Sequence, residues 1–314
     1  MSERPRIALF VDKPDWHTRR LKQAFSVHGA DLVAVSLADS GFVIGNGGHG
    51  LQIPKFGDAL PDAVFVRIIS AGSFEQVTMR LGVLHALREL GVPVHNDARV
   101  VERCVDKSMT SFLLHRSGIP TPPTWSIESA AQARALVESE VRPGRPLVLK
   151  PLFGSQGRGL RLIDSVDALP PPDETAGVYY LQHYVAGAAP GWRDWRVFVV
   201  GGSAVAAMIR HGVQWRTNAS QGARCEGVAA RGEIADLAVG AAAAVGASYA
   251  GVDIIQSASG AYLVLEVNSM PAWRALQQVT AIDIADVLAG NLVAALRLPA
   301  AGRLRRVRGA AGRR

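Results

Sequence analysis

The order of apolar runs and of glycine or proline breaks predicts an α/β fold in the first third of the chain and an α+β fold in the rest. Apolar runs typical of buried strands alternate with helical patterns up to residue 98, as in a mostly parallel sheet covered by helices. Beyond a proline-rich crossing at residues 119–125, paired apolar runs joined by short turns predict antiparallel sheets.

The first layer is expected to hold buried strands and two helices, one beginning at Asp15 and one ending at Gly91. Its glycine cluster GNGGHG does not open a helix, so the layer lacks a dinucleotide fingerprint. The predicted strands are residues 6–11, 31–37, 62–68 and 92–94, and the predicted helices are residues 15–28 and 74–90.

The second part begins with one long predicted helix that Gly118 stops, and it continues with strands that return on themselves, as at the Gly201–Gly202 turn. The predicted helices are residues 97–117, 130–139, 233–245 and 283–296. The predicted strands are residues 147–149, 178–185, 195–200, 203–210, 249–256 and 262–267. We divide the chain into an N-terminal domain (1–98), a central subdomain (99–185), a C-terminal subdomain (186–300) and a basic disordered tail (301–314).

The composition is that of a globular protein with a sizeable core. The 314 residues are 48% hydrophobic and 19% charged, and no apolar stretch is long enough to span a membrane. The N-terminus lacks the pattern of a signal peptide. Cys104 and Cys225 have no partners at metal-binding spacing, so we expect reduced thiols in a cytoplasmic protein.

The net charge of +7 is uneven, because residues 303–314 hold six arginines and no acid. Such a tail is typically solvated, whereas the alternative is contact with nucleic acid or another polyanion. The tail has no aromatic residue to stack on bases, so a nucleic-acid partner is disfavoured.

The stretch KPLFGSQGRG, residues 150–159, combines one lysine with three glycines. Glycines let backbone N–H groups approach phosphate oxygens closely, and the lysine adds a charge. A Walker loop would place the lysine after the glycines and open a helix, but here the apolar run LRLI follows. The pattern predicts a flap between two strands, although an ordinary hairpin turn fits about as well.

Three oxygen-bearing side chains fall on neighbouring predicted strands. Glu266 and Asn268 are two residues apart and therefore project from one face, and Asp253 lies on the partner strand. Carboxylate and amide oxygens are the ligands that Mg²⁺ prefers. A solvated sheet face is the alternative, but the apolar neighbours favour a magnesium site. Lys107, in the middle of a predicted helix, is uninformative alone and would ordinarily be a surface lysine.

Taken together and in this order, these segments resemble the ATP-grasp superfamily, and within it the RimK-type glutamate ligases. The resemblance covers about residues 99–296, and the first layer resembles the N-terminal domain of that family. Within this branch, NSMPAWRALQQVT is most similar to ligases that add glutamate to tetrahydromethanopterin. The matching segments are DKSMTSFLLHRSGIPTPPT, VLKPLFGSQGRGL, YLQHYV, DWRVFVVGGSAVAAMIR, TNASQGA, GVDII and LEVNSMPAW.

The resemblance implies ATP and two Mg²⁺ ions, with Mn²⁺ as a possible substitute, and it implies roles for individual residues. The nucleotide would be held by Lys107, Lys150, Gly154, Ser155, Gln156, Gly157, Gly159, Gln182, His183, Tyr184, Val185 and Asp194. The metal ligands would be Asp253, Glu266 and Asn268, and the catalytic residues at the transferring phosphoryl group would be Arg210 and Asn218. From their places in the sequence, the candidate substrate arginines are Arg67, Arg196, which we expect Asp194 to orient, and Arg274, with an ordinary surface arginine as the alternative for each.

Two positions depart from the family pattern. His183 stands where the hinge often has an acid, and Ala272 where the family often has glycine. For a flat acceptor, Trp16, Trp215 and Trp273 are a candidate aromatic wall, with core packing as the alternative.

The implied reaction joins an amino acid, expected to be L-glutamate, to the carboxylate of a small-molecule acceptor through an acyl-phosphate, releasing ADP and phosphate. Lysine, arginine and magnesium suit this chemistry because the protein mainly neutralises charge and positions reactants. A protein C-terminus or another cofactor is the alternative acceptor. A non-catalytic nucleotide- or nucleic-acid-binding protein that uses the arginine tail is the alternative of another class. The resemblance also implies a homo-oligomer, a dimer or a tetramer.

Overall fold

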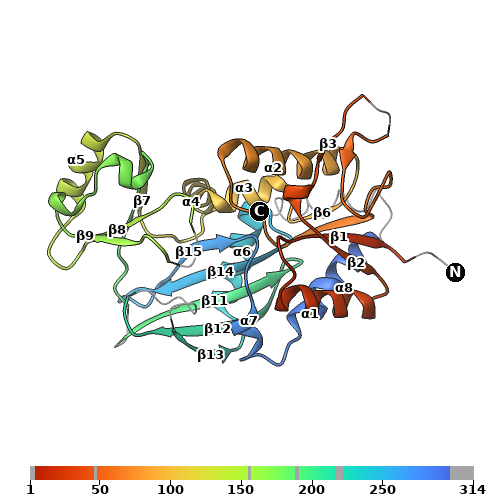
Figure 1. Ribbon diagram of the computed structural model, residues 1–314. Helices are drawn as coiled ribbons and strands as arrows, with labels where there is room; N and C mark the ends of the chain where they lie inside the picture. The colour runs from red at the N-terminus through yellow and green to blue at the C-terminus, as the bar shows by residue number, and fades with distance from the viewer. Residues whose placement is uncertain (1–3, 46–47, 155–156, 188–190, 216–221, 298–314) are drawn as a thin grey trace.

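The computed structural model describes residues 4–45, 48–154, 157–187, 191–215 and 222–297. Three main sheets lie side by side, with the largest in the middle (Figure 1). A parallel sheet from the start of the chain lies on one flank of it, and a small antiparallel sheet lies on the other. The predicted combination of a parallel α/β layer with two antiparallel sheets is confirmed.

The N-terminal sheet is parallel throughout and has the strand order β2-β1-β5-β6. Its two helices, α1 (Trp16–Val27) and α2 (Phe74–Glu89), begin at capping boxes made by Asp15 with Thr18 and by Ser73 with Gln76. The strands are β1 (Arg6–Phe10), β2 (Asp31–Val35), β5 (Ala63–Val66) and β6 (Val94–His95). The unpredicted elements, each two or three residues long, are η1 (Leu37–Asp39), β3 (Gly41–Phe42) and β4 (Leu51–Gln52).

The single helix predicted over residues 97–117 is wrong, because the chain forms two helices there. These are α3 (Ala98–Val105) and α4 (Lys107–Arg116). The backbone of Asp106 is extended (φ −80°, ψ 104°), and its carboxylate accepts the N–H groups of Ser108 and Met109, so it caps α4. Lys107 therefore begins a helix rather than lying in the middle of one.

The small antiparallel sheet has the order β7-β10-β8-β9 and carries the glycine loop between β8 and β9. These two strands pair antiparallel, so the predicted arrangement of strand, loop and strand is confirmed. Residues of α5 (Ala130–Glu140) pack on this sheet. The strands are β7 (Thr124–Ile127), β8 (Leu147–Lys150), β9 (Arg161–Ile163) and β10 (Tyr179–His183), and two short 3₁₀ turns are η2 (Val166–Ala168) and η3 (Pro172–Thr175).

The central sheet has five antiparallel strands in the order β13-β12-β11-β14-β15. Gly201 and Gly202 make the predicted turn with φ of 57° and 82°, values that suit a two-residue hairpin. The strands are β11 (Trp192–Val200), β12 (Ser203–Gly212), β13 (Arg224–Val228), β14 (Tyr249–Gln256) and β15 (Tyr262–Asn268). The edge strand β13 was not predicted.

Both faces of the central sheet are covered. Val197 and Val199 of β11 pack toward α6 (Glu233–Val245), α3 and α4, whereas Phe198 and Val200 pack toward α7 (Arg274–Gln277), α8 (Ile284–Leu296) and the N-terminal layer. The alternation follows from the two-residue period of a strand. The sheet is therefore fixed between the two helical layers.

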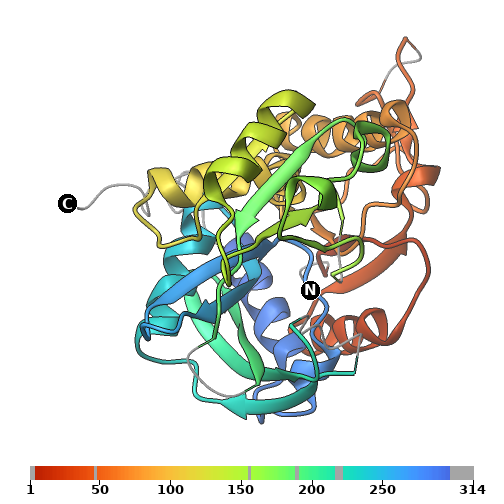
Figure 2. The ribbon, with the colours of Figure 1, turned by 90° about the vertical axis from the view of Figure 1, so that its left-hand side faces the viewer.

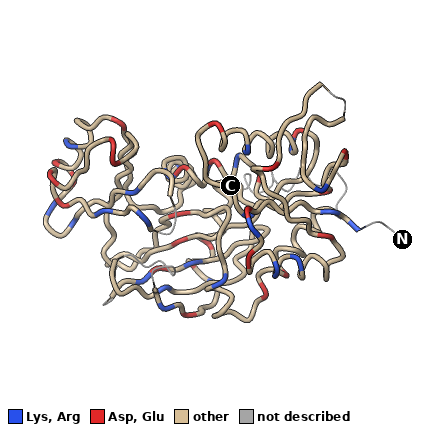
Figure 3. The backbone as a smooth tube through the Cα atoms, in the orientation of Figure 1, with Lys and Arg blue, Asp and Glu red and all other residues tan. Residues whose placement is uncertain are grey.

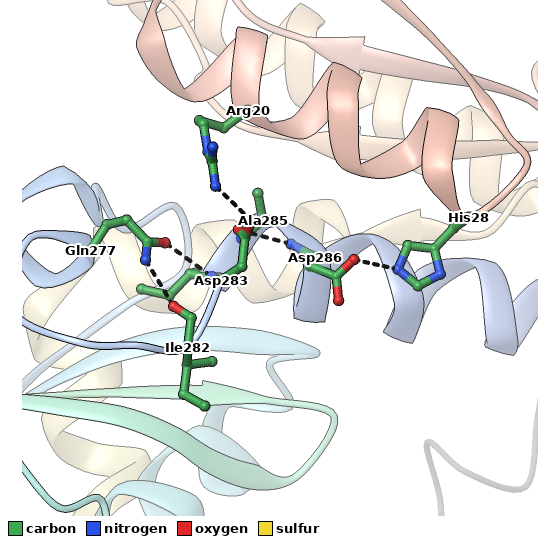
Figure 4. A network of polar contacts seen from close by, with 8 residues as sticks. Arg20, His28, Gln277, Ile282, Asp283, Ala285 and Asp286 are labelled. Atoms are coloured by element: carbon green, nitrogen blue, oxygen red, sulfur yellow. Dashed lines mark hydrogen bonds and ion pairs between the residues drawn. The ribbon is translucent and has the colours of Figure 1, made fainter.

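Helix α8 also ties the end of the described chain to its beginning. It lies against α1 (Figures 1 and 2), and polar contacts reinforce the interface (Figure 4). Arg20 of α1 donates to Asp283, the N-cap of α8, at 2.6 Å, and the His28 ring lies 2.9 Å from a carboxylate oxygen of Asp286. The N-terminal layer and the central sheet therefore share one apolar core.

Acidic and basic residues are interspersed along the described chain rather than separated into regions of one sign (Figure 3). Cys104 and Cys225 form no disulfide. No helix in the described ranges has the length and apolar character needed to cross a membrane. The basic tail predicted for residues 301–314 lies outside the described residues.

Candidate active site

A pocket opens between the small antiparallel sheet and the central sheet, and the glycine loop contributes to its wall. Residues predicted from six separate segments of the chain line this one pocket. They are Lys107, Lys150, Gly154, Gly157, Gln182, His183, Tyr184, Val185, Asp194, Arg210, Asp253 and Glu266.

Two lysines converge on the pocket from different elements. Lys150, at the end of β8, donates from Nζ to Oε1 of Gln182 at 2.6 Å. Lys107, the first residue of α4, donates to the carbonyl oxygens of Gly154 (2.9 Å) and Leu152 (3.3 Å) in the glycine loop. Burial lowers the pKa of both amines; for Lys150 the nearby Lys107 lowers it further, Glu266 opposes the shift, and the result is about 8. The site therefore concentrates positive charge that an anion would stabilise.

Two carboxylates face each other across the strands β14 and β15. Asp253 pairs in register with Glu266, so both side chains leave the same face of the sheet. Burial raises the pKa of Glu266, and the negative charge of Asp253 raises it further. The lysines only partly offset these effects. A carboxylate in this position is an unfavourable charge unless a cation shares the site.

Asn268 lies on the same face as Glu266, two residues along β15, and its Nδ2 donates to the Gly251 carbonyl at 3.4 Å. No group of three or more His, Cys, Asp or Glu side chains suitable for a metal occurs in the described part of the chain. Two carboxylates and one amide oxygen are a donor set that suits Mg²⁺, which keeps other positions for water and phosphate oxygens.

A buried network of two arginines and two aspartates lies next to these carboxylates. Arg210 is held by both oxygens of Asp194, with Nε 2.7 Å from Oδ1, and its Nη2 lies 3.1 Å from Oδ1 of Asp253. Arg196 grips both oxygens of Asp253, with Nη2 2.8 Å from Oδ2. Burial opposes the charge of Arg210, but Asp253 and Asp194 prevail and raise its pKa. Burial likewise opposes ionisation of Asp253, but Arg196 and Arg210 keep its pKa below the ordinary value.

The expectation that Asp194 orients Arg196 is wrong. Strand register explains the difference, because Asp194 of β11 lies opposite Arg210 of β12, whereas Arg196 of β11 lies opposite Asp253 of β14. Each arginine therefore meets the acid directly across the strand pair.

The predicted hinge, residues 182–185, comprises the last two residues of β10 and the two that follow, and it lies along one wall of the pocket. The His183 ring lies 3.0 Å from a carboxylate oxygen of Glu140 in α5, so the side chain that departs from the family pattern has an acidic partner. The Tyr184 hydroxyl accepts a hydrogen bond from Trp192 Nε1 at 3.2 Å. The Tyr184 ring meets Trp215 edge to face, with 6.3 Å between centroids.

The three tryptophans proposed as one aromatic wall are not together. Trp215 lines the pocket, whereas Trp16 and Trp273 lie with His17 at the start of α1. Arg67 and Arg274 belong to this second location: Arg67 lies over Trp273 at 5.4 Å, and Arg274 over Trp16 at 5.9 Å.

The remaining predicted residues are distributed as follows. Gly159 has a φ of 74°, and a Cβ there would lie 2.7 Å from Pro151, so glycine is needed at this position. Ser155, Gln156 and Asn218 lie outside the described residues. Arg158 and Arg193 also line the pocket and were missed by the sequence reasoning. Arg158 could have been found, since it is the basic residue inside the glycine loop.

Known proteins match this chain over most of its length. The profile of the RimK-like ATP-grasp domain matches residues 104–292. The tetrahydromethanopterin:alpha-L-glutamate ligase of Methanococcus maripaludis is 31% identical over 291 residues, covering 90% of this chain and 96% of that protein. An alpha-aminoadipate–LysW ligase of Saccharolobus solfataricus is 30% identical, covering 64% of this chain and 74% of the relative.

A solved structure has the same fold. The RimK domain ATP-grasp protein of Sphaerobacter thermophilus superposes with a TM-score of 0.66 at 20% identity, covering 90% of this chain and 98% of the other. The family profile spans more than half of the chain and includes the lysines, the glycine loop and the facing carboxylates. The resemblance predicted from the sequence is confirmed, and the chain belongs to the RimK-like ATP-grasp family of ligases.

Proposed function

We propose that this protein joins L-glutamate to the carboxylate of a small-molecule acceptor similar to tetrahydromethanopterin, using ATP and releasing ADP and phosphate. The observation that carries the proposal is the convergence of Lys107, Lys150 and Arg210 with the facing carboxylates Asp253 and Glu266 in one pocket. The acceptor and the amino acid follow from the name of the Methanococcus relative, which this chain matches over nearly its whole length.

The nucleotide binds with its phosphates between the two lysines and beneath the glycine loop. Lys107 already contacts carbonyl oxygens of the loop, so an incoming phosphate and the loop compete for the same ammonium group. The adenine lies along residues 182–185. Backbone N–H groups of the loop then point at the phosphates, because glycines leave them accessible.

Asp253, Glu266 and Asn268 would hold Mg²⁺. When bound, this ion supplies positive charge against the phosphate oxygens and against the charge that develops during transfer. The fit rests on the desolvated pair of carboxylates described above, since a bound cation would offset their mutual repulsion. Arg196 and Arg210 occupy part of the coordination space of Asp253, so ion binding requires their contacts with it to rearrange.

The reaction proceeds in two transfers. An oxygen of the acceptor carboxylate attacks the γ-phosphorus of ATP, the bond to the β-phosphate oxygen breaks, and ADP leaves. The neutral amine of glutamate then attacks the acyl carbon and loses a proton, and phosphate leaves. Arg210 neutralises the transferring phosphoryl group, Asp194 fixes its guanidinium, and the glycine loop excludes water that would hydrolyse the acyl-phosphate.

The acceptor class is the least constrained part of the proposal. The similar proteins include a ligase named for alpha-aminoadipate and LysW, and an ATP-grasp ligase solved with a precursor peptide, at 21% identity and a TM-score of 0.66. A protein or peptide acceptor is therefore the second candidate. It differs from the first in a measurable way, because only one of the two acceptors would gain mass.

The test is ADP release by the full-length protein with Mg²⁺, ATP and L-glutamate, across acceptors that include tetrahydromethanopterin and glutamate-ended peptides. Mass spectrometry follows each acceptor for the gain of one glutamate residue. We expect a product with the pterin that is lost in Lys150→Met and Glu266→Gln. Lys55→Met is the control, since the Lys55 ammonium group donates to the Ala34 carbonyl in the N-terminal layer and does not line the pocket. A product on peptides alone would replace the acceptor, and glutamate-independent ADP release would overturn the ligase assignment.

A further inference from the structure

Arg67 is a cation buried at the end of β5. The residue is 6% exposed and follows β5 directly. Its Nη1 donates to the carbonyl oxygen of Met270 at 3.3 Å, and its Nε is buried with no hydrogen-bond partner. Among the described residues, no carboxylate forms an ion pair with it. Buried charges in proteins are ordinarily paired, so an unpaired guanidinium indicates a missing anion.

The location is the one that α/β sheets use for ligands. The chain moves from β1 to β2 on one side and later places β5 on the other side of β1, so the strand order reverses between β1 and β5. Ligands of open parallel sheets bind beyond the carboxyl ends of the strands at this switch point. Arg67 lies there, and its backbone N–H donates to Phe10, the last residue of β1.

His17, Asp15 and Arg274 lie near Arg67, and Asp15 is an anion that partly compensates the guanidinium. Nδ1 of His17 lies 2.9 Å from Oδ2 of Asp15, and Nε2 of His17 accepts a hydrogen bond from the Trp273 backbone N–H at 3.3 Å. These two contacts fit a neutral imidazole with its proton on Nδ1. Asp15 is engaged by the first turn of α1 through Thr18. Arg274 adds a second guanidinium over Trp16.

The indole of Trp273 provides a second unused donor. Trp273 is 1% exposed, lies beneath the Arg67 guanidinium, and has a buried Nε1–H without a partner. Two buried donors without partners therefore lie on neighbouring side chains. A carboxylate can accept both, since it has two oxygens with free lone pairs.

This location is connected to the active site by the segment that follows β15. Met270, which accepts from Arg67, comes two residues after Asn268. Pro271 packs so closely on Gly251 that a Cβ at Gly251 would lie 2.8 Å from it and 3.0 Å from Arg196. Arg196 in turn holds Asp253. A short series of contacts therefore connects the carboxylates of the pocket with Arg67.

We infer that Arg67 and the Trp273 indole form a subsite for a substrate carboxylate that is not the one activated beside Arg210. The inference rests on the proposed function and extends it, because it assigns a positioning group to a second carboxylate of a dicarboxylic substrate. That carboxylate belongs either to the incoming amino acid or to the acceptor. Both sources share the same chemistry, and the experiment separates them.

The experiment measures binding rather than turnover. The full-length protein, with Mg²⁺ and a non-hydrolysable ATP analogue, is titrated calorimetrically with L-glutamate and with alanyl-glutamate as an acceptor surrogate. The variants are Arg67→Met and Arg67→Lys. Arg103→Met is the matched control, because Arg103 is a partly buried arginine whose Nη1 also donates to a backbone carbonyl, that of Val245.

We expect Arg67→Met to weaken one of the two probes about 10- to 100-fold, the value of a lost charge-assisted hydrogen bond to a carboxylate. Arg67→Lys should recover part of the loss, and the control should bind as the wild type does. Weaker glutamate binding assigns the subsite to the amino acid, and weaker dipeptide binding assigns it to the acceptor. Equal binding of both probes by wild type and Arg67→Met, or no binding of either probe by the wild type, overturns the inference.

A second measurement on the unaltered protein protects the test against a variant that does not fold. The indole ¹H–¹⁵N signal of Trp273, assigned with Trp273→Phe, should shift when the bound probe is added. An unmoved signal at saturation overturns the subsite. If the protein ligates but Arg67→Met binds both probes as the wild type does, the subsite is wrong and the proposed function stands. If Arg67→Met weakens the binding of a probe but the protein does not ligate, the subsite stands and the proposed function is wrong.

Discussion

The ion pair between Asp194 and Arg210 offers the sharpest test of the energetics of the site. Both residues are 4% exposed, and the contact is bidentate. Asp194→Asn removes the charge but keeps the shape. Breaking one partner of a buried pair costs about 3 to 5 kcal/mol. Asp253 remains 3.1 Å from Arg210, so we expect the lower end, about 3 kcal/mol.

The assay is thermal unfolding of the protein without ligands. A loss of about 3 kcal/mol corresponds to a fall of about 6 °C or more in Tm for a large domain. Glu226→Gln is the matched control on β13, where a half-exposed carboxylate meets His211 at 3.0 Å and Arg224 at 3.4 Å and should contribute about 0 to 1 kcal/mol. Equal Tm shifts for the two variants would refute the argument that burial and bidentate geometry make this pair strong.

Three further outcomes follow from the charges of the site and of the first helix. The pKa of Lys150 is lowered to about 8, so nucleotide affinity measured by calorimetry should fall as the pH rises from 7 to 9, and Lys150→Met should abolish this dependence. Glu266→Gln should raise the Tm of the metal-free protein, because the pKa of this carboxyl is raised by burial beside Asp253, yet remove the Tm increase caused by Mg²⁺ with nucleotide. Asp15→Ala should cost about 1 kcal/mol in urea unfolding at pH 7 through loss of the helix cap. Because the pKa of Asp15 is lowered to about 2, that difference should shrink as the pH falls from 4 toward 2.

Local signals in the sequence were sufficient where one residue controls the backbone. Asp15 and Gly91 set the limits of helices, and Gly201 with Gly202 set the hairpin turn. The break at Asp106 was missed because its signal is the conformation of one residue inside a continuous helical pattern. The edge strand β13 was missed because Gly227 interrupts the sequence pattern expected of a strand. That glycine is required by a neighbour distant in sequence, since a Cβ there would lie 1.9 Å from the Val279 carbonyl oxygen.

In the site, too, some features could be predicted from local patterns and others could not. Facing carboxylates could be predicted from the two-residue period of β15 and from its pairing with β14. The partners of Arg196 and Arg210 could not, because they depend on the register in which β11 pairs with β12 and with β14. The orphaned state of Arg67 is a property of three segments packed together, namely the ends of β1 and β5 and the loop after β15. No local pattern contains this information.

Transfer of an acceptor oxygen to phosphate tests the proposed acyl-phosphate most directly. An acceptor that gains glutamate in the ligation assay is prepared with ¹⁸O in its carboxylate and incubated with the protein, Mg²⁺, ATP and L-glutamate. The proposed route predicts one ¹⁸O atom in each released phosphate, because that oxygen becomes the bridge of the acyl-phosphate and departs with phosphorus. Label in AMP, or unlabelled phosphate in step with product, would contradict the proposed mechanism.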